Sequence, residues 1–168
     1  MINNKYKRLA VAFTGPSNSG KTTLIVKISN ILQDSGYKVS IVKHDPKDKA
    51  IFDKEGKDSF KFSQTGADVA VVSPNKTTYF KKQTSSIDEL IDIFKDFDFL
   101  LVEGLKTLPL PRICISRNKL DENYFDVSDT LAIDDTIDTK TIPDGMNVLD
   151  LNNPEQIVAW IKENAKKV

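Results

Sequence analysis

Short apolar runs alternate along the chain with longer stretches in which apolar residues recur every three or four positions. The runs lie at residues 8–13, 38–43, 68–73, 99–104, 112–116, 130–134 and 147–151. Several are nearly continuous and rich in β-branched residues, as expected for strands of a sheet that is covered on both faces. Strands that alternate with helices predict an α/β fold, with a mainly parallel (mixed) sheet flanked by helices.

Two long stretches show helical periodicity and recognisable ends. Residues 21–36 carry an apolar stripe, and Gly36 suits the end of a helix. Residues 153–168 begin with Asn153 as the predicted N-cap and Pro154 at the first helical position. The pattern predicts a helix over each range.

Two shorter segments also have local signals. In residues 85–97, Ser86 and Glu89 have the spacing of a capping box and precede an apolar stripe, which predicts a helix. Residues 74–82 are typical of a turn that leads into a polar strand of a hairpin.

Length and charge narrow the class of protein. A chain of 168 residues has the size of a single domain, and such a domain buries about 70% of its unfolded surface. Lys plus Arg and Asp plus Glu each number 24, so the formal net charge is zero. Nucleic acids and anionic membranes favour a strongly basic face, so neither is an expected partner.

Cysteine usage and hydropathy point to a cytoplasmic protein. Cys114 is the only cysteine, which excludes an internal disulfide and fits a reducing cytosol. Cys114 and His44 alone cannot form a four-ligand zinc site within one chain. The apolar run near the N-terminus is too short for a signal peptide, and no run approaches the length of a membrane span. We expect residues 1–168 to form one soluble domain.

A glycine-rich phosphate loop is the strongest motif. Residues 15–22 read GPSNSGKT, a complete G-x-x-x-x-G-K-[ST] between a predicted strand and a predicted helix. In such loops backbone NH groups surround phosphate oxygens, and the helix dipole adds positive potential. We expect Lys21 on the outer phosphates, the Thr22 hydroxyl on Mg²⁺ and Thr23 near the inner phosphate. The candidate residues are Gly15, Pro16, Ser17, Asn18, Ser19, Gly20, Lys21, Thr22 and Thr23.

A phosphate site of this kind also needs an acidic residue to orient Mg²⁺ or its water. The run at 99–104 is flanked by Asp98 and contains Glu103 near its other end. The two residues are about 16 Å apart along a strand, too far to serve one ion. Ligands of parallel sheets lie at the carboxyl ends of the strands, so we predict Glu103, with Lys21, as the catalytic group and Asp98 as a solvated strand start.

Residues 42–59 form the most charged stretch, and it contains the only histidine. The stretch follows the strand at 38–43, so it leaves from a carboxyl end and is expected on the rim of the nucleotide pocket. Asp45 or Asp48 is a candidate to approach Mg²⁺ through water, and His44 is a candidate to orient a ligand of the ion or to contact substrate. A solvated charged loop explains the same residues, and both interpretations stay open.

Residues 56–59, Gly-Lys-Asp-Ser, precede a predicted short helix at 59–66. Asp58 or Ser59 is the expected N-cap of that helix. A helix start that faces the pocket would also allow Lys57 and Asp58 to contact the nucleotide.

Base recognition has one candidate. Residues 118–121 read Asn-Lys-Leu-Asp after a predicted strand, where GTPases keep Asn-Lys-x-Asp. In those proteins the carboxylate accepts two NH groups of guanine, a pairing that adenine cannot match. Asn and Asp are also common in turns, so Asp121 is either a guanine contact or a turn residue.

The ordered set of motifs resembles the MobB family, molybdopterin-guanine dinucleotide biosynthesis protein B. The resemblance rests on GPSNSGKTTL, VKH, GKDS with TGAD, LLVEGLK and PRICISR, and it extends from about residue 9 nearly to the C-terminus. It implies a P-loop fold that binds GTP with Mg²⁺ and has at most weak GTPase activity. It also implies a homodimer that assists the partner enzyme attaching GMP to molybdopterin.

The resemblance implies specific site residues as well. Glu103 is the implied acid, and the implied nucleotide site is Gly15, Ser19, Gly20, Lys21, Thr22 and Thr23. The signature loop of the family is matched by His44, Lys57, Asp58 and Ser59, and the role of these four residues stays open. The chain departs from the family pattern at Lys47, where a second histidine is often found, and at Leu105, where an aromatic residue is common. A mechanism that needs two histidines in this loop is therefore in doubt.

Other protein classes share the phosphate loop. A small-molecule or nucleoside kinase usually closes an arginine-bearing lid, but the chain has only Arg8, Arg112 and Arg117. A metallochaperone GTPase would carry His- or Cys-rich ligand sets, which one His and one Cys do not supply. A nucleotide-free interaction module would leave the intact loop unexplained. The sequence leaves open whether molybdopterin itself binds.

Overall fold

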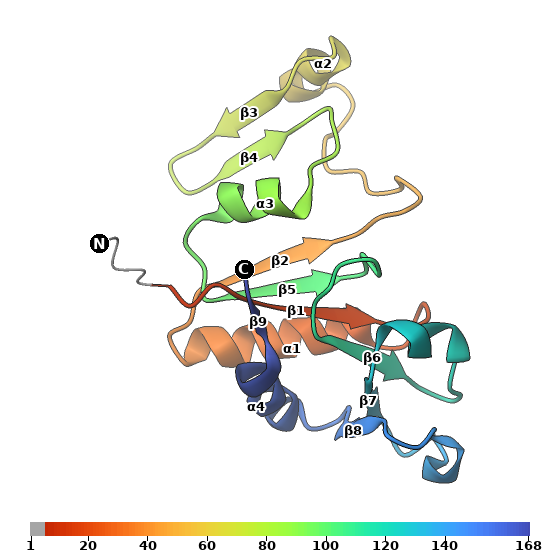
Figure 1. Cartoon of the computed structure of the whole chain (residues 1–168). Helices are drawn as coiled ribbons and strands as arrows, with labels where there is room; N and C mark the ends of the chain where they lie inside the picture. Colours follow the sequence, from red (N-terminus) through yellow and green to blue (C-terminus); the bar gives the residue numbers. More distant parts are fainter. Residues whose placement is uncertain (1–5) are drawn as a thin grey trace. The chain divides into compact units, whose positions relative to one another are not determined.

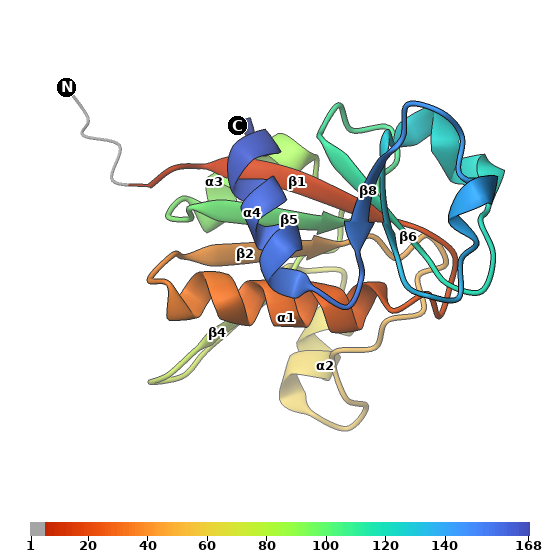
Figure 2. The ribbon, with the colours of Figure 1, turned by 90° about the horizontal axis from the view of Figure 1, so that it is seen from below.

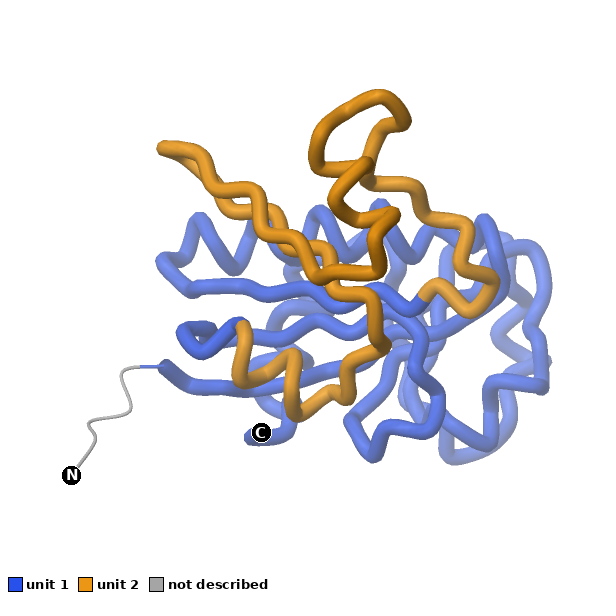
Figure 3. The backbone as a smooth tube through the Cα atoms, turned by 90° about the horizontal axis from the view of Figure 1, so that it is seen from above, with its two compact units in different colours: residues 1–44, 94–168 blue, residues 45–93 orange. Residues whose placement is uncertain are grey.

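The computed structural model describes residues 6–168, which form two compact units (Figure 3). Of the described residues, the first unit contains 6–44 and Phe94–Val168, and the second contains Asp45–Ile93. Within residues 6–168, none of the helices has the length and apolar character needed to cross a bilayer.

The first unit is built on a mainly parallel sheet, as the strand and helix pattern predicts (Figure 1). Its strand order is β2-β5-β1-β6-β7-β8, with β9 paired antiparallel to β1. Strand β1 is therefore central, and β5 and β6 flank it in parallel. The strands are β1 (Leu9–Thr14), β2 (Val39–Lys43), β5 (Phe99–Glu103), β6 (Arg112–Ser116), β7 (Thr130–Ile133), β8 (Asn147–Asp150) and β9 (Lys166–Lys167).

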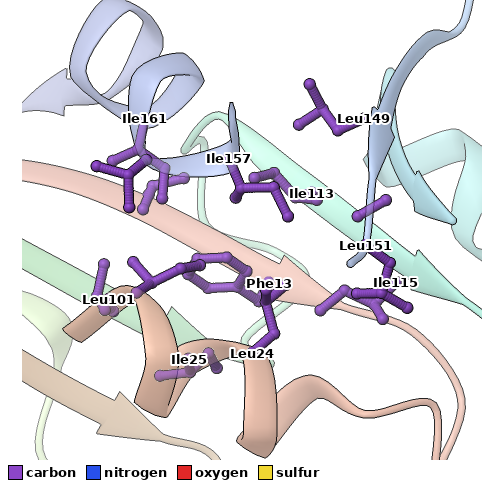
Figure 4. Packing of buried hydrophobic residues seen from close by; sticks show 14 of the residues in the cluster. Phe13, Leu24, Ile25, Leu101, Ile113, Ile115, Leu149, Leu151, Ile157 and Ile161 are labelled. Atoms are coloured by element: carbon purple, nitrogen blue, oxygen red, sulfur yellow. The ribbon is translucent and has the colours of Figure 1, made fainter. Parts of the chain in front are cut away.

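Two helices cover one face of this sheet, α1 (Lys21–Asp34) and α4 (Pro154–Asn164) (Figure 2). The apolar stripe of α1 packs with Phe13, Ile113 and Ile115 of the sheet and with Ile157 and Ile161 of α4 (Figure 4). A helical period on α1 and an alternating period on the strands thus bury one continuous core.

The other face of β6 and β7 carries a smaller core. Cys114 lies between Ile113 and Ile115 and therefore points away from α1. It packs with Leu131, Ile133 and Ile137, and residues of the short 3₁₀ helices η1 (Glu122–Val127) and η2 (Thr139–Thr141) or next to them complete the cluster.

The second unit contains α2 (Asp58–Gln64), β3 (Val69–Val72), β4 (Thr77–Phe80) and most of α3 (Ile87–Phe94). Strands β3 and β4 form the predicted hairpin as a two-stranded antiparallel sheet of their own. The Ser86 hydroxyl accepts from the Glu89 amide at 3.2 Å, and the Glu89 carboxylate accepts from the Ser86 amide at 3.1 Å. This pair confirms the capping box at the start of α3.

Two predicted helix ends are wrong. Helix α4 stops at Asn164, because Lys166 and Lys167 form β9 against Ala10 and Leu9. The predicted N-caps Asp58 and Ser59 are also wrong. Lys57 holds the N-cap position of α2, and the Ser59 hydroxyl instead donates to Asp53 at 2.9 Å.

The prediction of a solvated Asp98 is wrong too. Asp98 is 9% exposed, and its carboxylate accepts the backbone amides of Lys7 at 3.0 Å and Lys38 at 2.9 Å. The carboxylate thus ties the starts of β1, β2 and β5 together, which no local pattern around Asp98 indicates.

Candidate functional site

The phosphate loop joins the end of β1 to the start of α1, the context that its motif requires. Gly15 has φ +133°, and a Cβ there would collide with the backbone carbonyl of Ile115 on the neighbouring strand β6. Gly20, with φ +94°, is the N-cap of α1. Both positions need glycine, so the loop can approach β6 closely and turn sharply into the helix.

Lys21 bends back over this loop. Its ammonium donates to the carbonyls of Gly15 at 2.9 Å and Pro16 at 2.6 Å. Burial lowers the pKa of Lys21, the Glu103 carboxylate opposes that shift, and the Lys43 ammonium adds to it. Two neutral carbonyls offset only part of the free-energy cost of half-burying the ammonium charge. A bound anion in their place would interact with the ammonium more strongly.

A second polar group in the loop is the hydroxyl of Ser19. Ser19 is 4% exposed, and its hydroxyl has no hydrogen-bond partner among residues 6–168. A buried hydroxyl without a partner is costly and calls for an explanation such as a missing ligand. The contacts of Lys21 and the hydroxyl of Ser19, unpartnered among the described residues, are thus two independent observations that support a phosphate site at this loop.

Glu103 lies at the carboxyl end of β5, beside the end of β1. It pairs in register with Phe13 of β1 and with Lys43 of β2. Its side chain is 14% exposed, and its carboxylate lies 3.6 Å from the Lys43 ammonium. Asp98 is at the opposite end of the strand, so the parallel sheet brings only Glu103 to the edge of the phosphate loop, as the strand direction predicts.

His44 follows β2 and contacts the turn after Glu103. Its amide donates to the Glu103 carbonyl at 2.9 Å, and a Cβ on Gly104 would lie 2.9 Å from the His44 Cβ. The sequence motifs Lys-His and Val-Glu-Gly therefore meet in space at the ends of two paired strands.

Arg112 shapes that turn, a role that the motif analysis missed. The residue is 2% exposed, and its guanidinium donates to the carbonyls of Gly104 at 2.8 Å, Leu105 at 2.9 Å and Leu108 at 3.3 Å. Burial lowers the pKa of the Arg112 guanidinium. A basic residue at the start of an otherwise apolar strand was the only sequence signal for it.

A second network that the sequence did not indicate lies beside Gly20. A Cβ on Gly20 would lie 3.4 Å from the Nε of Arg117, and this Nε is 3.3 Å from the carboxylate of Asp134. The Thr136 hydroxyl donates to Asp134 and accepts the Asn118 amide at 2.7 Å. The network ties the end of β6 to the end of β7 next to the phosphate loop.

The Asp134 side chain is 7% exposed, so its charge depends on these partners. The hydroxyl of Thr136 is the main cause that lowers the pKa of Asp134, with a smaller contribution from Arg117, while burial opposes the shift. A carboxylate that stays charged in this way fixes the direction of the Arg117 guanidinium.

Asp121 acts as the N-cap of η1. Its carboxylate accepts the Asn123 amide at 3.1 Å and the Asn123 side-chain amide at 2.8 Å. Helix η1 packs on the Cys114 face of β6, where the Lys106 ammonium lies 3.8 Å from the centre of the Tyr124 ring. Burial raises the pKa of Cys114.

The remaining predicted site residues belong to the second unit. The Asp45 carboxylate accepts the amides of Lys47, Lys49 and Ala50, so it organises the turn that follows it. Lys57 starts α2, and the Asp58 carboxylate lies 3.2 Å from the Lys61 ammonium on the surface. The first unit alone brings together the phosphate loop, Glu103 and His44.

Metal-ligating side chains are sparse. Across residues 6–168, no three His, Cys, Asp or Glu side chains gather in a way that could hold a metal ion. Mg²⁺ in phosphate sites takes most of its ligands from water and phosphate and needs only one or two protein groups. Thr22 and Glu103 are of the right chemistry for that limited role.

Comparison with known proteins identifies relatives. Residues 10–135 match the family model "Molybdopterin guanine dinucleotide synthesis protein B". A relative from Methanocaldococcus jannaschii is 30% identical over 131 residues, which are 74% of this chain and 54% of that protein, so the match spans about half of the relative's length. The molybdopterin-guanine dinucleotide biosynthesis adapter protein of Haemophilus influenzae is 29% identical over 167 residues, 96% of this chain and 90% of that protein.

A solved structure agrees at the level of the fold. The crystal structure of MobB from Bacillus subtilis superposes with a TM-score of 0.75 at 23% identity, over 94% of this chain and 98% of that one. The fold of the first unit, the phosphate loop at the end of β1 and the match over residues 10–135 all agree. The chain belongs to the MobB family and has a P-loop NTPase fold.

Proposed function

We propose that this chain binds GTP together with Mg²⁺ at the phosphate loop. The observation that carries the proposal is that two polar side chains of the loop lack an anionic partner in the described part of the chain. Lys21 is held by two backbone carbonyls, and the buried Ser19 hydroxyl has no partner among residues 6–168. A phosphate oxygen at the start of α1 would satisfy both groups and would lie at the positive end of the helix dipole.

Glu103 and Thr22 are the groups that would hold Mg²⁺, with Asp45 as a further candidate through water. Bound Mg²⁺ would neutralise charge on the outer phosphates. The Glu103 carboxylate lies 3.6 Å from the Lys43 ammonium, and Arg112 holds the turn that follows Glu103. Lys21 would place its charge on the outer phosphates, and Glu103 would supply the acidic group beside them that holds the ion.

We propose at most a weak GTPase activity for this arrangement. Lys21 and Glu103 are the two catalytic candidates, and Arg117 is a third charged group beside the loop. Positioned charges of this kind stabilise the transferring phosphoryl group.

In the cell we propose an adapter role. Relatives in the family are named as adapter proteins of molybdopterin-guanine dinucleotide biosynthesis. By that relationship the chain would act as a cytoplasmic homodimer and assist the partner enzyme that attaches GMP to molybdopterin. A GTP site on the adapter would place guanine nucleotide next to that enzyme.

Calorimetric titration with GTP and ATP, with and without Mg²⁺, tests the binding proposal. Lys21→Ala should weaken Mg-GTP binding by about 2–4 kcal/mol, as expected for loss of a charge-assisted contact. Lys27→Ala, an exposed lysine of the same helix, is the matched control and should bind as the wild type does. A folded Lys21→Ala protein with undiminished affinity would show that the phosphates bind elsewhere.

A further inference from the structure

A cavity of about 380 Å³, widely open to solvent, lies at the carboxyl ends of β7 and β8, and the motif analysis gave no sign of it. It is lined by apolar Ile133, Val148 and Leu149 and by the acidic residues Asp134, Asp135 and Asp150. Strands β1, β6, β7 and β8 are parallel neighbours, so the cavity lies on the same edge of the sheet as the phosphate loop. Its volume falls within the range of small-molecule sites.

Arg117 connects the cavity to the loop. The guanidinium lies against Gly20 on one side and is paired with Asp134, a wall of the cavity, on the other. Strand β7 is two strand spacings from β1, which is about 10 Å. A nucleotide whose phosphates lie on the loop would therefore pass Arg117 and reach the cavity with its base.

We propose that this cavity holds the nucleoside half of the bound nucleotide and that Asp135 recognises guanine; the inference rests on the GTP site proposed above. Arg117 would face the sugar-phosphate part of the ligand. The apolar walls would cover the faces of the ring, and one carboxylate would accept its two adjacent NH groups.

The hydrogen bonds distinguish Asp135 from the other carboxylates nearby. Asp134 is engaged by Thr136 and Arg117, and one oxygen of Asp150 accepts the Asn152 amide at 2.8 Å. Asp121, the candidate from the sequence motif, accepts two hydrogen bonds from Asn123 as the cap of η1. Among residues 6–168, Asp135 makes no side-chain hydrogen bond or ion pair, and its side chain is exposed at the cavity.

A base-swap experiment tests the assignment. Xanthine carries an oxygen where guanine carries its amino group, so an amide side chain suits xanthine and a carboxylate suits guanine. Asp135→Asn should lower the affinity for Mg-GTP and raise that for xanthosine triphosphate, each on the order of 10- to 100-fold. Arg117→Ala should weaken both nucleotides alike and leave their ratio unchanged.

Three Asp→Asn variants serve as comparisons. Asp121→Asn and Asp150→Asn should leave the ratio of the two affinities as in the wild type, and so should Asp126→Asn, an exposed carboxylate of η1 outside the cavity. The inference is overturned if Asp121→Asn or Asp150→Asn shifts the preference from GTP to xanthosine triphosphate. It is also overturned if a folded Asp135→Asn protein shows no such shift. A wild-type protein that binds no GTP refutes the proposed function itself, which is a separate result from GTP binding without a switch.

Discussion

Gly104 and His44 are in direct contact at the ends of β5 and β2. A Cβ on Gly104 would lie 2.9 Å from the His44 Cβ, and Gly104 has φ +89°. Both the space and the backbone conformation therefore require glycine. The contact holds the turn after Glu103 against the start of the charged segment that follows β2.

Gly104→Ala should lower the free energy of unfolding by about 1–3 kcal/mol, because the methyl group meets His44 in a strained backbone. Gly36→Ala is the control, since Gly36 has φ +84° but nothing within 4 Å of an added Cβ. Denaturant unfolding of both variants separates the contact from the backbone cost. Equal losses in the two variants would show that the turn yields to the methyl group.

Substitution of Glu103 should affect nucleotide binding, whereas substitution of Asp98 should affect stability. Glu103→Gln should weaken the Mg²⁺-dependent part of GTP binding by about tenfold or more, with little change in stability. Asp98→Asn should leave binding unchanged and cost about 1–3 kcal/mol of stability, because the amides of Lys7 and Lys38 lose a charged acceptor. Titration calorimetry and thermal unfolding measure the two effects. If both substitutions weakened the Mg²⁺-dependent part of GTP binding equally, the proposed role of Glu103 would be refuted.

Residues 44–58 should respond to nucleotide if Asp45, Lys57 or Asp58 contacts it. We expect slower amide hydrogen exchange over this range with Mg-GTP, because a phosphate-bound cation would add a contact to the ones these charges make within their own segment. Within this range the amides of Lys49 and Ala50 are already bonded to Asp45, so their exchange should change least and they are the internal reference.

Helix α4 should exchange equally in both states. A Lys57→Ala, Asp58→Ala double variant should reduce the protection of residues 44–58. Unchanged exchange with nucleotide demonstrably bound would assign the segment to plain solvated surface.

The hairpin of β3 and β4 is the expected site of homodimer formation. Val72 is 76% exposed and Tyr79 50%, and each strand of a two-stranded sheet leaves one edge open for pairing. Val72→Lys should convert the dimer to a monomer in light scattering at micromolar concentration. Val26→Lys, a 52% exposed valine of α1, should leave the mass unchanged. A monomer mass for the wild type, with and without GTP, would exclude the dimer.

Features that depend on neighbouring residues in the chain could be predicted from the sequence. The strands, the apolar stripe of α1, the Ser86–Glu89 cap and the Asn153 cap arise from local spacing, so they follow from the pattern alone. The phosphate loop is equally local, because one turn between β1 and α1 supplies every group of its motif. The position of Glu103 followed from the direction of a parallel strand.

Features that depend on which strands become neighbours were decided only by the tertiary structure. Residues 69–72 have the composition of a buried strand but pair with β4 in a separate hairpin. Three charged residues find their partners on other elements. Asp98 accepts the amides of Lys7 and Lys38. Arg112 donates to carbonyls of the turn after Glu103, and Arg117 pairs with Asp134. The cost of burying a charge is offset by partners far away in sequence, so the residue's own surroundings in the chain do not reveal whether it is buried.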